Sequence, residues 1–387
     1  MNYPLDIFSS SFFRALVLFT GCFVQPFVSL FGSDLLSALV MQERIQEIYN
    51  NSKSAVVRVK ATKEVKSDGK TRKLLKMGSG FFVSKDGHVL TTGLLKDPDR
   101  IWIEHESAFY LAENVGRDPL CNVSMIKVSE LPKSFSHIPL SDYDTEKIVG
   151  SYLVGLTCAL DFAVGPTLGL LQSKEFAFGK RLFPTMMLRT SLALGPGEVG
   201  GPVFDLQGRF IGMCHAALPD LKSSFIIPAN ACIRIRDDLI LSGKVDYGWF
   251  GISTSRKLND TSHFNIVVSS IIKGSPASKT ELKSGDIIKS IDKKEVKKQG
   301  DLAFASFYAR PGTIVEMEVV REEKVIKIPI KVTSRPIINT TNDELIADVN
   351  RISPSVSSEN ENNSTEDPEK VGNFYKFNKY IKMTESL

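Results

Sequence analysis

The chain has 387 residues, of which 42% are apolar and 24% are charged. This length allows two or three domains with hydrophobic cores, and the composition excludes a fully disordered, collagen-like or polytopic membrane chain. The 48 basic and 44 acidic residues leave a net charge of +4, which is too small to argue for a nucleic-acid partner.

The first part of the chain contains a long uncharged run. No charged side chain occurs from Ala15 to Ser33, close to the roughly 20 residues that a helix needs to cross a bilayer. We expect residues 1–33 to be an export signal or a membrane anchor, with a lipoprotein signal at Cys22 as a further alternative. Arg14 precedes the run, which favours export of everything that follows. Residues 34–53 then show helical apolar spacing and are expected to form an amphipathic lead-in.

The cysteines suggest neither a disulfide framework nor a metal site. They are odd in number, widely spaced and in no CxxC pair. We interpret them as small core residues and expect no metal and no cofactor. The five are Cys22, Cys121, Cys158, Cys214 and Cys232.

The segment 54–240 consists of short β-branched and aromatic runs separated by Gly, Asp and Pro. This pattern predicts an antiparallel barrel or sandwich. Two hairpin turns are predicted at Lys85–Gly87 and Leu206–Gly208, where glycine tolerates a positive φ. The segment Lys60–Lys76 holds seven basic and two acidic residues, and we expect a loop there, either solvated or used for docking.

A second domain is expected over residues 245–332. It combines strands with two short helical stretches and ends in a hairpin around Arg321–Lys324. Residues 333–387 are mostly polar and acidic, so we expect a disordered tail. Its last stretch alternates aromatic residues with lysines and leaves contact with a membrane surface or a partner open.

Several motifs occur in a characteristic order, namely GSGFFVSKDGHVLTTGLL, PLCNVSMIKV, LGPGEVGGPVFDLQGRFIGM and SSFIIPAN. Together they resemble the HtrA (DegP, Do-like) serine proteases, and the following domain resembles the PDZ domain of that family. The resemblance implies a mainly β fold, a trypsin-like double β-barrel followed by an α+β PDZ domain. It also implies a periplasmic or membrane-anchored protein, an oligomer such as a trimer, homomeric or heteromeric, and unfolded polypeptides or C-terminal peptides as partners.

The family's catalytic triad does not match this chain. The histidine position of the family is occupied by Leu94, the aspartate position by Asn122 and the nucleophilic serine position by Val199. Leucine cannot accept a proton, valine has no oxygen to attack with, and an amide cannot stabilise an imidazolium by charge. We therefore expect no catalytic residue at these positions.

Displaced residues offer a poor replacement for the triad. Cys214 and His215 are adjacent on a predicted strand, so their side chains should face opposite ways, a core thiol and a surface imidazole. His88 precedes Leu94 by six residues, and Thr190 and Ser191 precede Val199 by nine and eight. All of them would have to shift together to form a working triad.

Backbone groups remain as candidates for binding. The Gly197 and Val199 N–H groups could cradle a carbonyl or carboxylate oxygen, because backbone donors do not depend on the side chain. The alternative is that the Gly-Gly-Pro segment after them serves barrel folding alone. Both interpretations stay open.

The second domain carries the sequence YGWFGI, which matches the PDZ loop and strand that bind a chain terminus. Residues 301–309 are the expected groove helix. Trp249 and Phe250 could instead be ordinary core aromatics. The candidate peptide-binding residues are Gly248, Trp249, Phe250, Gly251, Ile252 and Leu302.

The leading hypothesis is an exported or membrane-tethered pseudoprotease that binds unfolded proteins or C-terminal peptides as a chaperone, scaffold or regulator of protein quality control. One alternative is an active HtrA-like serine endopeptidase that uses displaced residues. Another is a structural subunit of a hetero-oligomeric HtrA assembly.

Overall fold

The computed structural model describes residues 38–67, 70–141, 149–179, 181–258 and 264–336. The predicted export signal and nearly all of the predicted tail lie outside this part of the chain. The described part opens with a helix over residues 38–52, which continues into the 3-10 helix η1 (Lys53–Ala55). Of the helices in these ranges, none is both long enough and apolar enough to span a membrane.

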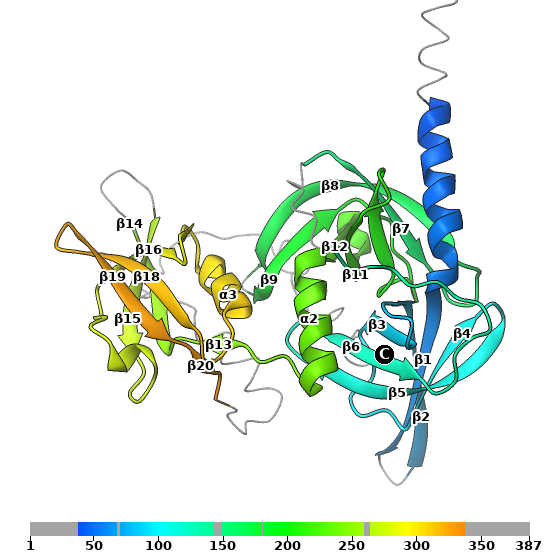
Figure 1. The fold of residues 1–387 in the computed structure, drawn as a ribbon, viewed down its shortest axis with the longest axis horizontal. Helices are drawn as coiled ribbons and strands as arrows, with labels where there is room; N and C mark the ends of the chain where they lie inside the picture. The colour runs from blue at the N-terminus through cyan, green and yellow to red at the C-terminus, as the bar shows by residue number, and fades with distance from the viewer. Residues whose placement is uncertain (1–37, 68–69, 142–148, 180, 259–263, 337–387) are drawn as a thin grey trace, which may run out of the picture.

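Six strands close the first barrel in the order β1-β2-β3-β6-β5-β4 (Figure 1). They are β1 (Val56–Ser67), β2 (Lys70–Phe82), β3 (His88–Thr92), β4 (Arg100–His105), β5 (Ala108–Asp118) and β6 (Val123–Val128). Alternate side chains of these strands point inward and fill the barrel, among them Val57, Phe82 and Ile126. Gly87 has a φ of 82°, so the expected left-handed turn between β2 and β3 is present.

A second barrel closes in the order β10-β11-β12-β9-β8-β7. Its strands are β7 (Tyr152–Thr157), β8 (Gly165–Phe178), β9 (Arg181–Thr190), β10 (Pro202–Asp205), β11 (Phe210–Leu218) and β12 (Ser223–Pro228). The 3-10 helix η2 (Pro219–Leu221) connects the last two, and helix α2 (Ala229–Ser242) follows. An extensive core joins the two barrels and α2, so the expected double β-barrel is confirmed.

The basic segment Lys60–Lys76 is not a loop, contrary to the sequence expectation. β1 and β2 pair through it as one long antiparallel hairpin, with Lys63 opposite Leu74 and Val65 opposite Arg72. Lysine-rich composition concealed the strands, because a ribbon that is exposed on both faces shows no apolar alternation.

The second domain is built on the sheet β14-β15-β16-β18-β19, with β17 beside β16. Its strands are β13 (Gly248–Trp249), β14 (Ile252–Leu258), β15 (Phe264–Ile271), β16 (Ile287–Ile291), β17 (Lys294–Glu295), β18 (Ile314–Arg321), β19 (Lys324–Lys331) and β20 (Thr333–Ser334). Its helices are η3 (Ala277–Lys279) and α3 (Gln299–Tyr308). The predicted groove helix thus begins two residues earlier and ends one residue earlier than expected. β20 pairs with β13, so the first two residues assigned to the tail belong to a sheet.

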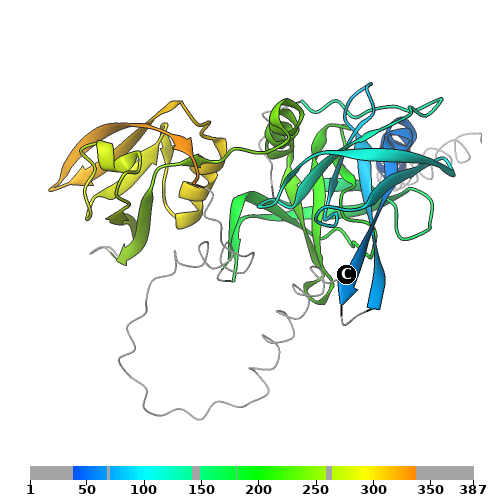
Figure 2. The same cartoon turned by 90° about the horizontal axis from the view of Figure 1, so that it is seen from below.

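Helix α3 lies between the two domains (Figures 1 and 2). Its Phe307 is fully buried in the core shared by the barrels, whereas its Leu302 packs against the core of the second domain. The Phe307 carbonyl accepts a 2.6 Å hydrogen bond from Arg234 of α2. Arg310, just after α3, forms a 2.6 Å ion pair with Asp238 of α2. One helix therefore belongs to the packing of both domains.

Candidate functional site

The three positions that correspond to a catalytic triad lie at the junction of the barrels. The Ser79 N–H donates to the Val199 carbonyl at 2.8 Å, which holds the loop before β10 against β2. A Cβ atom at Gly78 of β2 would lie 3.4 Å from the Val199 carbonyl oxygen and 3.8 Å from the Thr92 carbonyl oxygen. The segments that contain Val199 and Thr92 therefore both lie close to β2 at Gly78. The segments around these positions meet at this junction, which we call the cleft.

Leu94 does not present its side chain to this cleft. It is 5% exposed and belongs to the cluster that fills the first barrel. The preceding Gly93 has a φ of 64°, and its N–H donates to the Asn122 carbonyl at 3.0 Å. The position of the general base has become part of the hydrophobic core.

Asn122 is engaged by a neighbouring arginine. Its Oδ1 accepts a 2.9 Å hydrogen bond from Arg117 Nη2, and its backbone is left-handed, with φ of 52°. The closest carboxylate in sequence, Asp118, is fully buried and accepts a 2.7 Å hydrogen bond from Tyr247 Oη. Burial raises the pKa of Asp118 above its usual range. The side-chain oxygens of Asn122 and Asp118 thus already have other partners, Arg117 and Tyr247.

The loop at Val199 keeps a backbone arrangement that can bind an oxygen. Gly197 has a φ of 86°, and Val199 is half-buried. Among the described residues, neither the Gly197 amide nor the Val199 amide has a hydrogen-bond acceptor. Two unpaired donors two residues apart are the kind and spacing of groups from which an oxyanion hole is built.

Side chains that sequence reasoning did not single out hold this loop. Glu198 accepts hydrogen bonds from Thr157 Oγ1 at 2.7 Å and from the Gly195 amide. Ser79 Oγ donates to the Gly197 carbonyl at 2.9 Å and accepts from the Cys158 amide at 2.8 Å. The GSGF motif contains Ser79, so the signal was present in the sequence without an assigned role.

The glycines after Val199 are required by packing. A Cβ at Gly200 would lie 2.0 Å from Ser79 O, and one at Gly201 would lie 2.3 Å from Leu156 O. Real Cβ atoms do not approach backbone oxygens so closely. This close packing supports a folding role for the Gly-Gly pair and leaves the amides at 197 and 199 as the binding candidates.

The displaced serine, threonine and histidine candidates do not come together. His88 Nδ1 is hydrogen-bonded to Ser84 Oγ at 2.8 Å, within the turn between β2 and β3. Ser191 Oγ accepts from the Leu170 amide at 2.8 Å, and Thr190 Oγ1 pairs with Ser224 Oγ at 2.7 Å in the second barrel. No nucleophile and base from this set are in contact.

The expectation of a surface imidazole at His215 is wrong. His215 is half-buried, and its Nδ1 is buried without a hydrogen-bond partner in the described residues. A β-bulge between Cys214 and Ala216 breaks the regular alternation of the strand. Burial, helped by the charge of Arg181, lowers the pKa of His215 to about 4, which makes it a weak proton acceptor.

The cysteines near the cleft are poor nucleophiles. Cys214 is fully buried in the second barrel, and burial raises the pKa of its thiol far above the usual value. Burial also raises the pKa of Cys158 to about 11. Because the thiolate is the reactive form, both thiols are inert at neutral pH.

The YGWFGI segment forms a loop whose carbonyls face the domain interior. Ile272 N–H donates to the Gly251 carbonyl and Ala277 N–H to the Phe250 carbonyl, both at 2.9 Å. Ile252 therefore stands at a non-hydrogen-bonded position opposite Ile271, and its own N–H faces the open edge of β14. Within the described residues, the Phe250 and Gly251 amides have no acceptor. Unpaired amides beside an open sheet edge are the groups that can receive a carboxylate and an added strand.

The side chains of this loop divide between core and groove. Phe250 is 3% exposed in the domain core, so it offers its amide rather than its ring, while Ile252 and Leu302 are half-buried. Gly248 is buried and Trp249 half-buried on β13. A Cβ at Gly251 would lie 2.0 Å from Ser275 Cβ, so this position accepts glycine only.

Gln299 closes part of the groove. Its Nε2 donates to the Thr254 carbonyl at 3.0 Å and connects the start of α3 with the open edge of β14. A ligand strand that extends past Thr254 must replace this contact.

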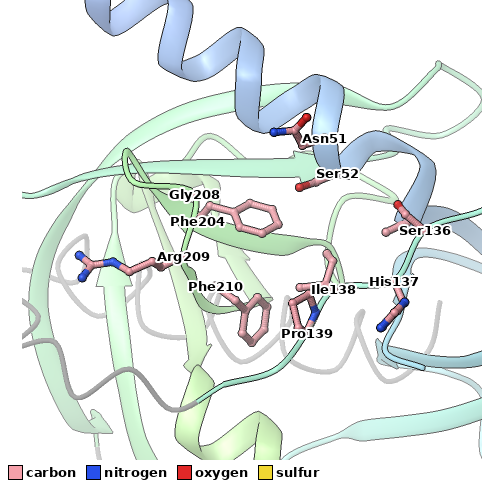
Figure 3. Close-up of a pocket in the computed structure, with 11 residues that line it drawn as sticks. Asn51, Ser52, Ser136, His137, Ile138, Pro139, Phe204, Gly208, Arg209 and Phe210 are labelled. Atoms are coloured by element: carbon pink, nitrogen blue, oxygen red, sulfur yellow. The ribbon is translucent and has the colours of Figure 1, made fainter. Parts of the chain in front are cut away.

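A separate pocket of about 130 Å³ lies at the end of helix 38–52 (Figure 3). Phe204, Phe210 and Ile138 form its apolar part, and Ser52 and His137 are among its polar residues. His137 has no ion-pair or hydrogen-bond partner in the described part of the chain. Ser52, Ser136 and His137 all line the pocket, but no hydrogen bond joins the imidazole to either hydroxyl in the described residues. Across the same residues, no three His, Cys, Asp or Glu side chains gather as a metal-binding group.

Comparisons with known proteins agree with this architecture. Residues 78–213 match the trypsin-like peptidase domain family, and residues 248–332 match the PDZ domain family. The chain is 29% identical over 279 residues to a probable periplasmic serine endoprotease DegP-like of Pseudomonas fulva, covering 68% of this chain and 57% of that protein. It is 30% identical over 278 residues to the Chlamydia trachomatis protein of the same name, covering 67% and 54%.

The chain is a member of the HtrA family. It spans just over half the length of these DegP-like relatives. Solved HtrA structures share its fold. The HtrA-type protease AlgW with a decapeptide has a TM-score of 0.61 at 21% identity, covering 76% of this chain and 99% of AlgW. The serine endoprotease from Yersinia pestis has a TM-score of 0.54 at 21% identity, covering 76% and 98%.

Proposed function

We propose that this HtrA-family chain is an exported pseudoprotease that binds C-terminal peptides or unfolded polypeptides through its PDZ domain without cleaving them. The observation that carries the proposal is the state of the triad positions. Leu94 is buried in the barrel core, Asn122 is held by Arg117, and Val199 has no reactive atom. The relatives' description as periplasmic supports the exported location.

A first experiment tests the absence of proteolysis. The chain from residue 34 to 387 should neither degrade casein nor react with a fluorophosphonate probe. Val199→Ser alone should also stay inactive, because a serine without a base remains protonated. Turnover that survives repurification and disappears when a residue of this chain is mutated would support the active-endopeptidase alternative instead.

A second experiment tests peptide binding. Peptides with a free apolar C-terminal residue should bind the chain, and amidation of that carboxylate should weaken binding about ten- to a hundred-fold, because a charge-assisted hydrogen bond is lost. Leu302→Glu should weaken binding in the groove, while Ile314→Glu, at a site 69% exposed on β18, should leave it unchanged. Equal binding of free and amidated peptides would favour the structural-subunit alternative.

We further propose that the Gly197 and Val199 amides bind a peptide carbonyl without cleavage. Their lack of acceptors supports this role. The amide NMR signals of these two residues should shift when a casein-derived peptide is added, and the Gly208 signal, in the turn between β10 and β11, should not. Unchanged signals at 197 and 199 would restrict the loop to a folding role.

A further inference from the structure

The hairpin of β1 and β2 extends beyond the first barrel. β1 pairs with β4 only from Arg58 to Thr62, and β2 pairs with β3 only from Gly80 to Phe82. Among the described residues, 63–66 and 71–76 therefore form a two-stranded ribbon without a third strand. On the β1 side the Glu64 amide donates to Asp99 Oδ2 at 2.6 Å, whereas the outer backbone groups of β2 at residues 71–75 have no backbone partner in the described residues. Such an edge is ready to pair with an additional extended segment.

The ribbon is basic and partly apolar. Lys66, Arg72 and Lys73 are exposed, and none of them has a carboxylate within ion-pair distance among the described residues. Leu74 and Leu75 are 38% and 50% exposed beside them. An elongated partner that carries both carboxylates and apolar side chains would fit this surface.

The same chain contains a segment of that chemistry. Residues 343–369 hold eight acidic residues and one basic residue. The part farthest from the second domain, residues 359–369, holds five of these eight acidic residues. Residue 369 follows Pro336 by 33 residues, a chain length that reaches on the order of 100 Å when extended. The segment is therefore long enough to reach the ribbon within one molecule.

The arrangement of the fold argues against a lipid surface as the partner. Helix 38–52 and β1 follow each other along one edge of the first barrel, and the ribbon projects from the end opposite to the helix (Figure 1). A bilayer that holds residues 15–33 would face the helix, so the ribbon would point away from it.

We propose that the acidic segment 343–369 binds the basic ribbon of β1 and β2 in the same molecule. Contacts between several exposed charges and a long acidic segment are weak individually and add up, and they are screened by salt. The ribbon is thereby covered in the intact chain and becomes available when the acidic segment is displaced by salt or by a competing acidic polypeptide.

Fluorescence anisotropy tests this contact in the full chain, with a dye attached to the thiol that Asn363→Cys introduces. Cys22→Ser removes the other accessible thiol, because the four described cysteines are buried. Anisotropy should fall when NaCl is raised from 0.05 to 0.5 M. The triple variant Lys66→Glu, Arg72→Glu and Lys73→Glu should show the low value at both salt concentrations. The matched control, Lys279→Glu, Lys289→Glu and Lys331→Glu on the exposed surface of the second domain, should behave like the parent chain.

Each other outcome overturns the proposal. Equal anisotropy in the parent and the ribbon variant means that the segment does not bind there. A signal that depends on protein concentration assigns the ribbon to the acidic segment of a second copy. Binding of phosphatidylglycerol vesicles that the ribbon variant loses, with no change in anisotropy, assigns it to lipid.

Discussion

The barrel cleft and the PDZ loop are two candidate sites that use different parts of the chain. In the cleft, chemistry depends on side chains, and Leu94 and Val199 cannot supply it. In the PDZ loop, the recognition we propose uses the backbone amides of Phe250 and Gly251, which are free of intramolecular acceptors in the described residues. Backbone donors tolerate substitution, whereas a nucleophile or a base does not. Under the proposed function, one chain would lack catalysis and still recognise peptides.

The largest effect is expected from restoring the base. Leu94→His places an imidazole in the interior of the first barrel and should lower the free energy of unfolding by about 2 to 5 kcal/mol. Urea unfolding followed by tryptophan fluorescence measures it, with Leu94→Met as a control that should cost less than about 1.5 kcal/mol. The triple variant combines Leu94→His with Asn122→Asp and Val199→Ser. If this variant folds stably and degrades casein, the cleft is only three substitutions from activity.

A pH experiment tests the histidine beside the cleft. An unfolded His215 has a pKa near 6.5, while burial lowers it to about 4 in the fold. Between these values the unfolded chain binds the extra proton, so stability should fall as pH drops from 6.5 to 4, by up to about 3 kcal/mol. His215→Leu should lose this part of the pH dependence, and His137→Gln should retain it. Identical pH profiles for the parent and His215→Leu would mean that His215 is solvated.

The loop that carries the Gly197 and Val199 amides should depend on Glu198. Glu198→Ala removes the acceptor for Thr157 and Gly195 and should destabilise the chain by about 2 kcal/mol. A double-mutant cycle with Thr157→Val measures the coupling by thermal unfolding. Additive effects would show that the loop holds its shape without this contact, and the cleft would then be less well organised than the PDZ loop.

The smallest effect is expected at the end of the PDZ groove. Gln299→Ala frees the Thr254 carbonyl on the edge of β14, so peptides long enough to pass this residue should bind more tightly, by at most about tenfold. Peptides of three residues should bind as before. Isothermal titration calorimetry with both lengths separates these cases, with Gln207→Ala in the second barrel as the control. Weaker binding of the long peptide would mean that Gln299 contacts the ligand directly.

Local patterns were enough to predict much of this protein. Alternating apolar runs and turn glycines indicated the barrels, and the resemblance of three segments to the family's motifs assigned the triad positions to Leu94, Asn122 and Val199. The YGWFGI loop was predicted from its resemblance to the PDZ loop, and the structure adds that Gly251 has a φ of 76° and no space for a side chain. The apolar alternation and the turn glycines follow from short-range sterics, which a sequence displays directly.

Only the tertiary structure decided which groups face each other. Closure of the first barrel took Leu94 into its core, and Arg117 met Asn122 because β5 pairs with β6. His215 lies at the β-bulge between Cys214 and Ala216 and is half-buried, and packing between domains buried Phe307 of α3. These contacts either join elements that lie apart in the sequence or depend on a β-bulge, which interrupts the two-residue period of a strand. Sequence periodicity reports which face of an element is apolar, but not which distant element covers that face.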